Sequence, residues 1–333
     1  MAPRVLIAGG YGLVGGNIAR HIRTVSQNVE LVLAGRSPDK GLPLARELGG
    51  ACTAFLDVED AASVADAASA DLIISALYDP ANALVEAALK QGAAHIGITT
   101  KADDVAPIAL AALRTPPRRP IVLLGHCAAG VATLVAQTAT QDFSRLDAIE
   151  IAALYDMRDP VGPMTASDAE MLVSRALLRE GGTWRWLDGR LHPRLVRLAD
   201  GTQLEAHPSG LLDAPSLASI TGAPNVRCDM MQGDSLGTRD GGRASSDAYV
   251  DMTGVLQSGA PGTRRTTISD PNGLAHLTAL GVLVAAERVL GLDGHAPAVG
   301  GLHMPETLVQ PQAAIERFRQ FGVRITSQDG DVL

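Results

Sequence analysis

The chain has 333 residues, 46% of them apolar and only 3% aromatic, and its formal charge at neutral pH is −8. That length allows about two domains, with a core that relies on Ala, Val, Leu and Ile. The negative charge disfavours nucleic acid and anionic membranes as main partners.

The three cysteines, Cys52, Cys127 and Cys228, lie far apart and outside any C-x-x-C spacing. Neither a disulfide framework nor a structural zinc site is therefore expected, and the eight histidines show no metal-ligand spacing. The first residues do not form a signal-peptide pattern, and no run of about 18 apolar residues occurs. We expect a cytoplasmic protein with no bound metal and no membrane association.

The first structured stretch, from Arg4 to Ile22, reads RVLIAGGYGLVGGNIARHI. Val5 to Ala8 is an apolar run typical of a strand buried on both faces, and apolar residues at helical spacing follow the glycines. A G-x-G-x-x-G pattern between a strand and a helix predicts a dinucleotide site, with the diphosphate on the N–H groups of the helix start. The alternative is a glycine-rich turn that binds nothing. The residues expected to contact the cofactor here are Gly10, Tyr11, Gly12, Leu13, Val14 and Gly15.

The second predicted strand, Glu30 to Ala34, indicates which dinucleotide binds. Enzymes that prefer NAD place an acid near its end to bind the ribose 2′-hydroxyl, but this chain has Ala34 there, followed by Arg36 and Ser37. A 2′-phosphate would be held by the Arg36 guanidinium, the Ser37 hydroxyl and Lys40. The sequence therefore favours NADP over NAD. The alternative is that Arg36 caps the loop and stacks on the adenine, which would serve either cofactor.

Four further strands alternate with helices in the first 130 residues. Cys52 to Leu56 ends at Asp57 and Val58, which are expected at the adenine edge, although Asp57 would equally cap the helix that follows. The strand Asp71 to Leu77 ends at Ala76 and Leu77, also expected at the cofactor, and a helix is predicted from Pro80 to Lys90. Strands over residues 94–99 and 121–124 complete a doubly wound parallel sheet of the Rossmann type.

The pattern changes near Gly130. Helices are predicted over residues 131–141 and 167–180, the second ended by Gly181 and Gly182, with a loop over 235–246 expected to be mobile. Short strands over 148–155, 184–186, 194–198, 226–230, 248–256 and 266–270 indicate a second α+β domain of mainly antiparallel sheet. The helix 274–290 is apolar nearly all round and is expected to pack between the domains.

We therefore expect a discontinuous dinucleotide-binding domain and one inserted domain. The first comprises residues 1–130 and 270–333, and the second, for substrate binding and dimerisation, comprises residues 131–269. The expected assembly is a homodimer.

Several segments together resemble the saccharopine dehydrogenase-like family in its shorter reductase form. They are VLIAGGYGLVGGNIA, LAGRSPDK, ADLIISALYDPANALVEAALKQGAAHIGIT, GLHMPETL and AAIERFRQFGVRI. The resemblance implies a Rossmann domain with a mixed second domain, NAD(P)H as hydride carrier, and reduction of an imine or oxidation of a secondary amine. Residues 98–101 depart from the family pattern, which has Asp, a small residue and an aromatic there.

Hydride transfer needs polar groups near the acceptor, and the ends of the parallel strands supply candidates. Lys101 is a candidate carboxylate partner or proton donor, Tyr78 a hydrogen-bond donor and His126 a proton carrier. Lys101 and His126 each have a simpler alternative, a solvated loop lysine and a hydrogen-bonded core histidine. Asp79 is either an acceptor at the site or a helix cap. Tyr155, Asp156 and Arg158 end the first strand of the second domain and are further candidates.

Other enzyme classes are excluded by their missing motifs. No Tyr precedes a Lys by four positions, and the nucleophile-elbow, zinc-protease and P-loop patterns are absent. The sequence predicts an NADP-preferring oxidoreductase that reduces a C=N or C=O group of a small carboxylate-bearing metabolite. The alternative is a binding protein that senses redox state without turnover.

Overall fold

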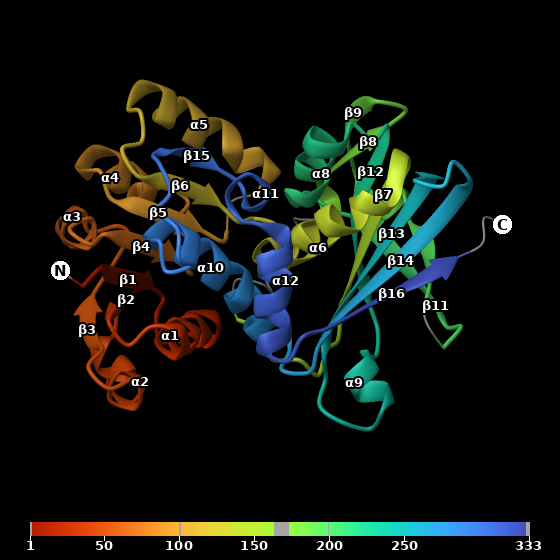
Figure 1. The fold of residues 1–333 in the computed structure, drawn as a ribbon. Coiled ribbons are helices and arrows are strands. Elements are labelled where there is room, and N and C mark those ends of the chain that lie inside the picture. The colour runs from red at the N-terminus through yellow and green to blue at the C-terminus, as the bar shows by residue number, and fades with distance from the viewer. Residues whose placement is uncertain (1, 100, 163–172, 199, 331–333) are drawn as a thin grey trace. The chain divides into compact units, whose positions relative to one another are not determined.

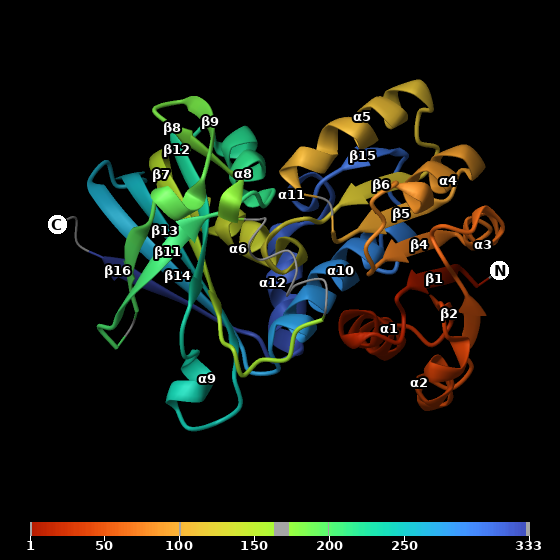
Figure 2. The same cartoon turned by 180° about the vertical axis from the view of Figure 1, so that it is seen from behind.

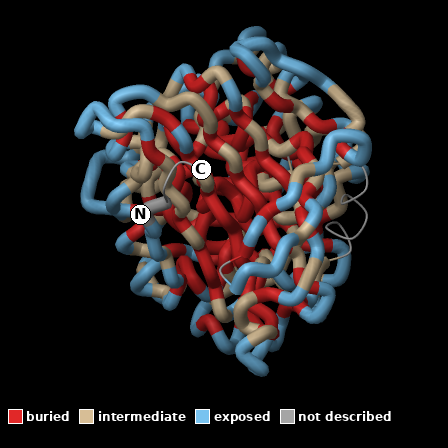
Figure 3. The backbone as a smooth tube through the Cα atoms, turned by 90° about the vertical axis from the view of Figure 1, so that its right-hand side faces the viewer, coloured by how far each residue is buried: buried red, intermediate tan, exposed pale blue. Residues whose placement is uncertain are grey.

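The structure, a computed structural model, describes residues 2–99, 101–162, 173–198 and 200–330 (Figure 1). The chain divides into two compact units. The first contains Met1–Gly125 and Thr278–Val309, and the second contains His126–Leu277 and Gln310–Leu333. In Figure 3 the buried stretches, in red, lie inside a shell of exposed backbone.

The first unit is built on a parallel sheet of the doubly wound type, as predicted. Within the described residues its strand order is β15-β6-β5-β4-β1-β2-β3. Its elements in chain order are β1 Arg4–Ala8, α1 Leu13–Val25, β2 Glu30–Gly35, η1 Pro38–Gly41, α2 Leu42–Glu47, β3 Cys52–Phe55, α3 Ala61–Ala67, β4 Leu72–Ser75, α4 Ala83–Gln91, β5 Ala94–Gly97, η2 Ala102–Asp104, α5 Val105–Arg114, β6 Pro120–Leu123, most of α10 Leu274–Leu290, β15 Gly301–His303 and α11 Pro305–Leu308.

The centre of this sheet is apolar on both faces. Ile7 in β1 pairs with Leu33 in β2 on one side and with Ile74 in β4 on the other, and all three are fully buried. Helices cover both faces, with α1 beside α10 (Figures 1 and 2). The chain reverses its direction of winding between β1 and β4, and open parallel sheets bind ligands beyond the carboxyl ends of such a pair.

The second unit is a mainly antiparallel sheet, again as predicted. Its strand order is β10-β11-β12-β7-β13-β14-β16, with β8 and β9 attached to β12. Among the pairings of its described strands, β12 with β7 is parallel and the others are antiparallel. Its elements are η3 Cys127–Gly130, α6 Val131–Ala139, η4 Thr140–Asp142, β7 Phe143–Tyr155, β8 Ala176–Glu180, β9 Thr183–Leu187, η5 Gly189–Leu191, β10 Arg194–Arg197, β11 Gln203–Pro208, α8 Asp213–Thr221, β12 Asn225–Gln232, α9 Leu236–Arg239, β13 Ser246–Leu256, β14 Pro261–Asp270, α12 Pro311–Gln320 and β16 Arg324–Gly330.

Three sequence-based boundaries were wrong. Residues 310–333 belong to the second unit rather than the first, because β16 pairs with β14 along its whole length. In the helix predicted over 167–180, residues 173 and 174 are helical, but Ala176 to Glu180 form strand β8. Gly181 and Gly182 turn β8 into β9 with φ values of +53° and +81°. Residues 167–172 of that prediction lie outside the described residues. The helix predicted from Pro80 begins at Ala83.

Helix α10 has the predicted bounds, and the division between the units falls inside it, at Thr278. Its Leu, Val and Ala side chains are buried nearly all round, as its composition requires. Among the helices formed by the described residues, none has the length and apolarity needed to cross a membrane.

Candidate dinucleotide-binding site

The turn between β1 and α1 is closed by backbone contacts that leave no room for a side chain at three glycines. Gly9 has φ +77°, and a Cβ there would lie 2.6 Å from the Ala76 carbonyl oxygen. A Cβ on Gly10 would lie 2.7 Å from a carbonyl oxygen of β1, and one on Gly15 would overlap the Gly9 carbonyl. The N–H groups of Gly9 and Gly10 donate to the Ala34 carbonyl, at 2.8 and 3.2 Å. These contacts fix the turn against the ends of β2 and β4.

Gly12 differs from these three glycines. Its φ is −75°, which any residue adopts, and it is exposed. A Cβ there would meet one protein atom within 4 Å, the Gly9 carbonyl oxygen at 3.2 Å. That contact is tight, but it is far milder than those at Gly9, Gly10 and Gly15, so the fold demands glycine less here than at the other three positions. A ligand that approaches the backbone would add a second demand.

The start of α1 offers free donors beside Gly12. The first hydrogen bond of the helix runs from Gly16 N–H to the Gly12 carbonyl at 2.8 Å, and Gly12 has no side chain to cap the end. The N–H groups of Leu13, Val14 and Gly15 precede that bond and have no protein acceptor in the described part of the chain. The first turn carries no acidic residue. An anion placed there gains both the donors and the helix dipole.

The loop after β2 presents its cationic side chains to solvent. Arg36, Ser37 and Lys40 are exposed, and the acid within this segment is Asp39 on η1. Tyr11 lies across this loop: its hydroxyl accepts a hydrogen bond from Ser37 N–H at 2.8 Å. The glycine turn and the predicted 2′-phosphate loop are thus joined by a direct contact.

Asp57 and Val58, predicted at the adenine edge, are half-buried after β3. The Asp57 carboxylate accepts from Glu59 N–H at 3.1 Å, a contact within its own turn. Helix α3 is capped instead by Asp60, which accepts from Ala62 N–H at 3.0 Å. Of the two roles considered for Asp57, helix capping is therefore wrong.

The end of β4 lies directly against the glycine turn. Ala76 N–H donates to the Ala8 carbonyl at 2.9 Å, so Ala76 and Leu77 lie beside Gly9. Tyr78 follows with 55% of its surface exposed. The Asp79 carboxylate caps the start of α4, where it accepts hydrogen bonds from the N–H groups of Ala83 and Leu84 at 3.0 and 2.9 Å.

The other predicted catalytic residues have structural contacts. Lys101 is half-buried at the start of η2, where its N–H donates to Asp104 at 3.0 Å. His126 belongs to the second unit, is 5% exposed, and has its Nε2 2.8 Å from the Ser216 hydroxyl. Burial lowers the pKa of His126 to about 4, against a smaller opposite effect of Asp213, so the ring is neutral at physiological pH.

Asp156, a candidate at the end of β7, is also engaged. Its carboxylate accepts from the Ser235 N–H and hydroxyl at 2.9 and 2.8 Å, from the Thr238 hydroxyl at 2.5 Å and from Arg158 N–H at 2.9 Å. Burial raises its pKa, but these hydrogen bonds outweigh that effect and lower it to about 2. Asp156 thus anchors the base of the 235–246 segment, which contains helix α9 where a loop was predicted.

No model of a protein family matches the sequence, and no curated protein matches it. Solved structures do match. Apo saccharopine dehydrogenase (L-Glu forming) from Saccharomyces cerevisiae aligns over 99% of this chain and 100% of its own, with a TM-score of 0.72 and 12% identity. The chain has the fold of saccharopine dehydrogenase. Amine dehydrogenase from Mycobacterium smegmatis aligns at TM-score 0.51 with 13% identity over 93% of this chain and 97% of its own. GenD2 from gentamicin A biosynthesis, in complex with NAD, aligns at 0.50 with 12% identity over 99% and 97%.

Two features of this saccharopine dehydrogenase fold were not predicted from the sequence. Gly9 was not assigned to the glycine motif, although its place in a Gly-Gly pair after a buried strand was a signal. The other is Asp213, fully buried in α8, which accepts from Cys127 N–H and the Thr133 hydroxyl, both at 2.7 Å. It holds a left-handed turn in which Ala128 and Ala129 have φ of +47° and +53°.

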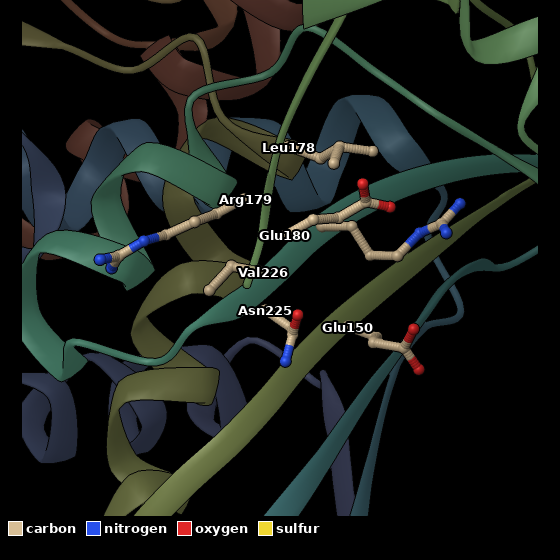
Figure 4. A pocket seen from close by; sticks show the side chains of 7 residues that line it. Glu150, Leu178, Arg179, Glu180, Asn225 and Val226 are labelled. Carbon is tan, nitrogen blue, oxygen red and sulfur yellow. The ribbon is translucent and has the colours of Figure 1, made fainter. Parts of the chain in front are cut away.

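The second unit also contains a small pocket of about 190 Å³, lined by Glu150, Leu178, Arg179, Glu180, Asn225, Val226 and Arg227 (Figure 4). Arg179 points away from Glu150, since its guanidinium donates to the carbonyls of Gly182 and Ala223 at 3.3 and 3.2 Å. Within the described residues, no group of three or more His, Cys, Asp or Glu side chains is placed to hold a metal ion.

Proposed function

We propose that the first unit binds a nicotinamide dinucleotide, with the diphosphate over Gly12 and the first turn of α1. Gly12 is the observation that carries this proposal: its conformation suits any residue, and a Cβ there would make one tight contact, at 3.2 Å to the Gly9 carbonyl oxygen, where the other three glycines would make overlaps. A ligand that approaches the backbone supplies a further reason for glycine at this position. The unpaired N–H groups and the missing acid at the start of α1 support it.

We further propose that the preferred form is NADP. The end of β2 carries Ala34 where an NAD site has an acid, and exposed Arg36 and Ser37 follow. The Arg36 guanidinium provides a planar, permanently charged donor for a 2′-phosphate. Lys40, exposed on η1, adds a second positive charge.

The proposed reaction is reduction of a C=N or C=O group of a small carboxylate-bearing metabolite. The saccharopine dehydrogenase fold and the fold-level likeness to an amine dehydrogenase support this class. When bound, NADPH supplies a hydride to the acceptor carbon, and the nitrogen or oxygen takes a proton, which gives an amine or alcohol and NADP⁺. Tyr78, exposed after β4, and Lys101, after β5, are the side chains proposed to donate that proton and to pair the substrate carboxylate.

His126 is not proposed as the proton donor, because it is neutral, buried and bonded to Ser216. Asp79 and Asp156 likewise use their carboxylates inside the protein. These occupied polar groups favour the second candidate function, a redox sensor that binds NADPH without turnover. Sustained NADPH oxidation with any amine and carbonyl pair would exclude that candidate.

Calorimetric titration of the wild type and of Gly12→Val with NADPH tests the proposed site. The variant is expected to keep the wild-type circular dichroism and nearly the wild-type melting temperature, and to lose NADPH binding by at least about a hundredfold, since the valine occupies the space of the diphosphate. Equal binding by both proteins would show that the ligand does not approach Gly12. No binding by the wild type would eliminate the function itself.

A further inference from the structure

Helix α5 is apolar on its solvent side as well as on its buried side. Ile108 and Ala112 face the interior, whereas Leu110 and Leu113 are 66% and 77% exposed. Ala106, Leu110 and Leu113 follow one another at spacings of four and three residues, which places them on one helix face. We call these three residues the α5 stripe. A surface helix normally carries charged side chains there, but residues 105–113 contain none.

The apolar surface extends to the edge of the parallel sheet. Strand β15 lies beside α5 (Figures 1 and 2) and is the edge strand of the sheet, paired with β6. Val299, which leads into β15, is 78% exposed, and Leu302 within it is 37% exposed. Several large apolar side chains on one edge of a unit mark an interaction surface, whereas single ones do not.

The charges at the two ends of α5 are opposite in sign. Lys101, Asp103 and Asp104 precede the helix and sum to one negative charge, whereas Arg114 is its last residue, with Arg118 shortly after. Two such helices packed antiparallel bring the basic end of each beside the acidic end of the other, while the leucines of each meet the small side chains Ala106 and Ala109 of the other. The arrangement repeats about a two-fold axis, as an interface between identical chains requires.

We propose that the α5 stripe is the interface through which two copies of this chain associate, with their α5 helices antiparallel. The charge pattern selects this occupant, because a helix acidic at one end and basic at the other is complementary to itself when reversed. The interface lies in the first unit, although the sequence analysis placed dimerisation in the second domain. The proposal does not depend on the proposed cofactor or reaction.

Sedimentation of the full chain at micromolar concentration tests the proposal. The wild type is expected at twice its chain mass of 34.5 kDa, and Leu110→Lys/Leu113→Lys at 34.5 kDa, because four lysines would meet across the two-fold axis. The matched control is Leu191→Lys/Leu195→Lys, whose leucines are 75% and 65% exposed in the second unit and which is expected to remain a dimer. Circular dichroism checks that every variant is folded.

A charge exchange tests the antiparallel geometry. Arg114→Glu is expected to raise the dimer dissociation constant about tenfold, and addition of Asp103→Arg to bring it most of the way back. A monomeric wild type overturns the proposal and leaves this face to a different protein. The proposal is also overturned if Leu110→Lys/Leu113→Lys stays dimeric, or if Leu191→Lys/Leu195→Lys dissociates instead. A third contrary result is that adding Asp103→Arg to Arg114→Glu does not lower the dimer dissociation constant.

Discussion

The Tyr11 hydroxyl accepts a hydrogen bond from Ser37 N–H at 2.8 Å, joining the glycine turn to the loop after β2. The ring lies against Gly35 and Gly41: a Cβ on Gly41 would be 2.9 Å from the Tyr11 Cδ1, and one on Gly35 would overlap its hydroxyl. A tyrosine in the motif thus occupies a backbone donor beside Arg36. In the proposed NADP site, the 2′-phosphate and the Tyr11 hydroxyl would compete for that donor.

Tyr11→Phe is therefore expected to tighten NADPH binding. Without the hydroxyl, Ser37 N–H is free to donate to a phosphate oxygen, and a charge-assisted hydrogen bond of about 1 kcal/mol lowers the dissociation constant about fivefold. NADH, which has no 2′-phosphate, should change less than about twofold. Parallel calorimetric titrations of both cofactors give the comparison, and weaker NADPH binding by Tyr11→Phe would show that the hydroxyl itself holds the cofactor.

Arg36→Ala is expected to weaken the binding of NADPH and to leave the binding of NADH nearly unchanged, the opposite of the effect expected for Tyr11→Phe. Loss of a guanidinium that binds a 2′-phosphate costs about 2 kcal/mol, or about thirtyfold in the NADPH dissociation constant, with NADH nearly unchanged. Arg46→Ala is the matched control, because Arg46 is an exposed arginine on the neighbouring helix α2. If both cofactors weaken equally, Arg36 stacks on the adenine and does not bind the phosphate.

Much of the first unit could be predicted because most of its strands are buried on both faces, and such strands read as short apolar runs. Strand β3 is the exception among β1 to β6, since its end residues Cys52 and Phe55 are exposed. Strand β15 was missed because its three residues, Gly301 to His303, carry no such run. Helix α5 was also missed, and its exposed leucines become informative only once their burial is known.

The second unit was harder because long-range pairing overrides local preference there. Residues 176–180, Ala-Leu-Leu-Arg-Glu, are good helix formers, yet they form β8 because β9 and β12 lie on either side. Asp213 accepts hydrogen bonds from Cys127 and Thr133, which precede it in the chain by 86 and 80 positions, so no local sequence pattern could predict these contacts. The contacts of two candidate site residues were hidden for the same reason, because His126 and Asp156 have partners about 80 to 90 residues away.

Gly15→Ala should destabilise the fold, whereas Gly12→Val is expected to leave the fold nearly as stable as the wild type and to lose NADPH binding. A methyl group on Gly15 overlaps the Gly9 carbonyl and lies 2.9 Å from the Gly10 Cα, so the turn must open. We expect a loss of at least about 2 kcal/mol in the free energy of unfolding, despite the higher helix propensity of alanine. Urea denaturation measures it. A variant as stable as the wild type would show that the turn tolerates the displacement.

Asp156→Asn should make the stability of the chain less dependent on acid pH. The carboxyl has a folded-state pKa of about 2, below its ordinary value of 3.8, so the charged form is stabilised by folding. That contribution, about 2 kcal/mol, is present above pH 4 and is lost as the pH falls through 2. Asparagine has no charge to lose.

Urea denaturation tests this prediction for Asp156→Asn. The free energy of unfolding of the wild type should exceed that of the variant by about 2 kcal/mol at pH 7, with the difference narrowing from pH 4 downwards. A gap that is the same at pH 7 and at pH 2.5 would show that the amide loses packing and not charge. Because Asp156 anchors the 235–246 segment, the variant should also be cleaved faster there by protease at pH 7.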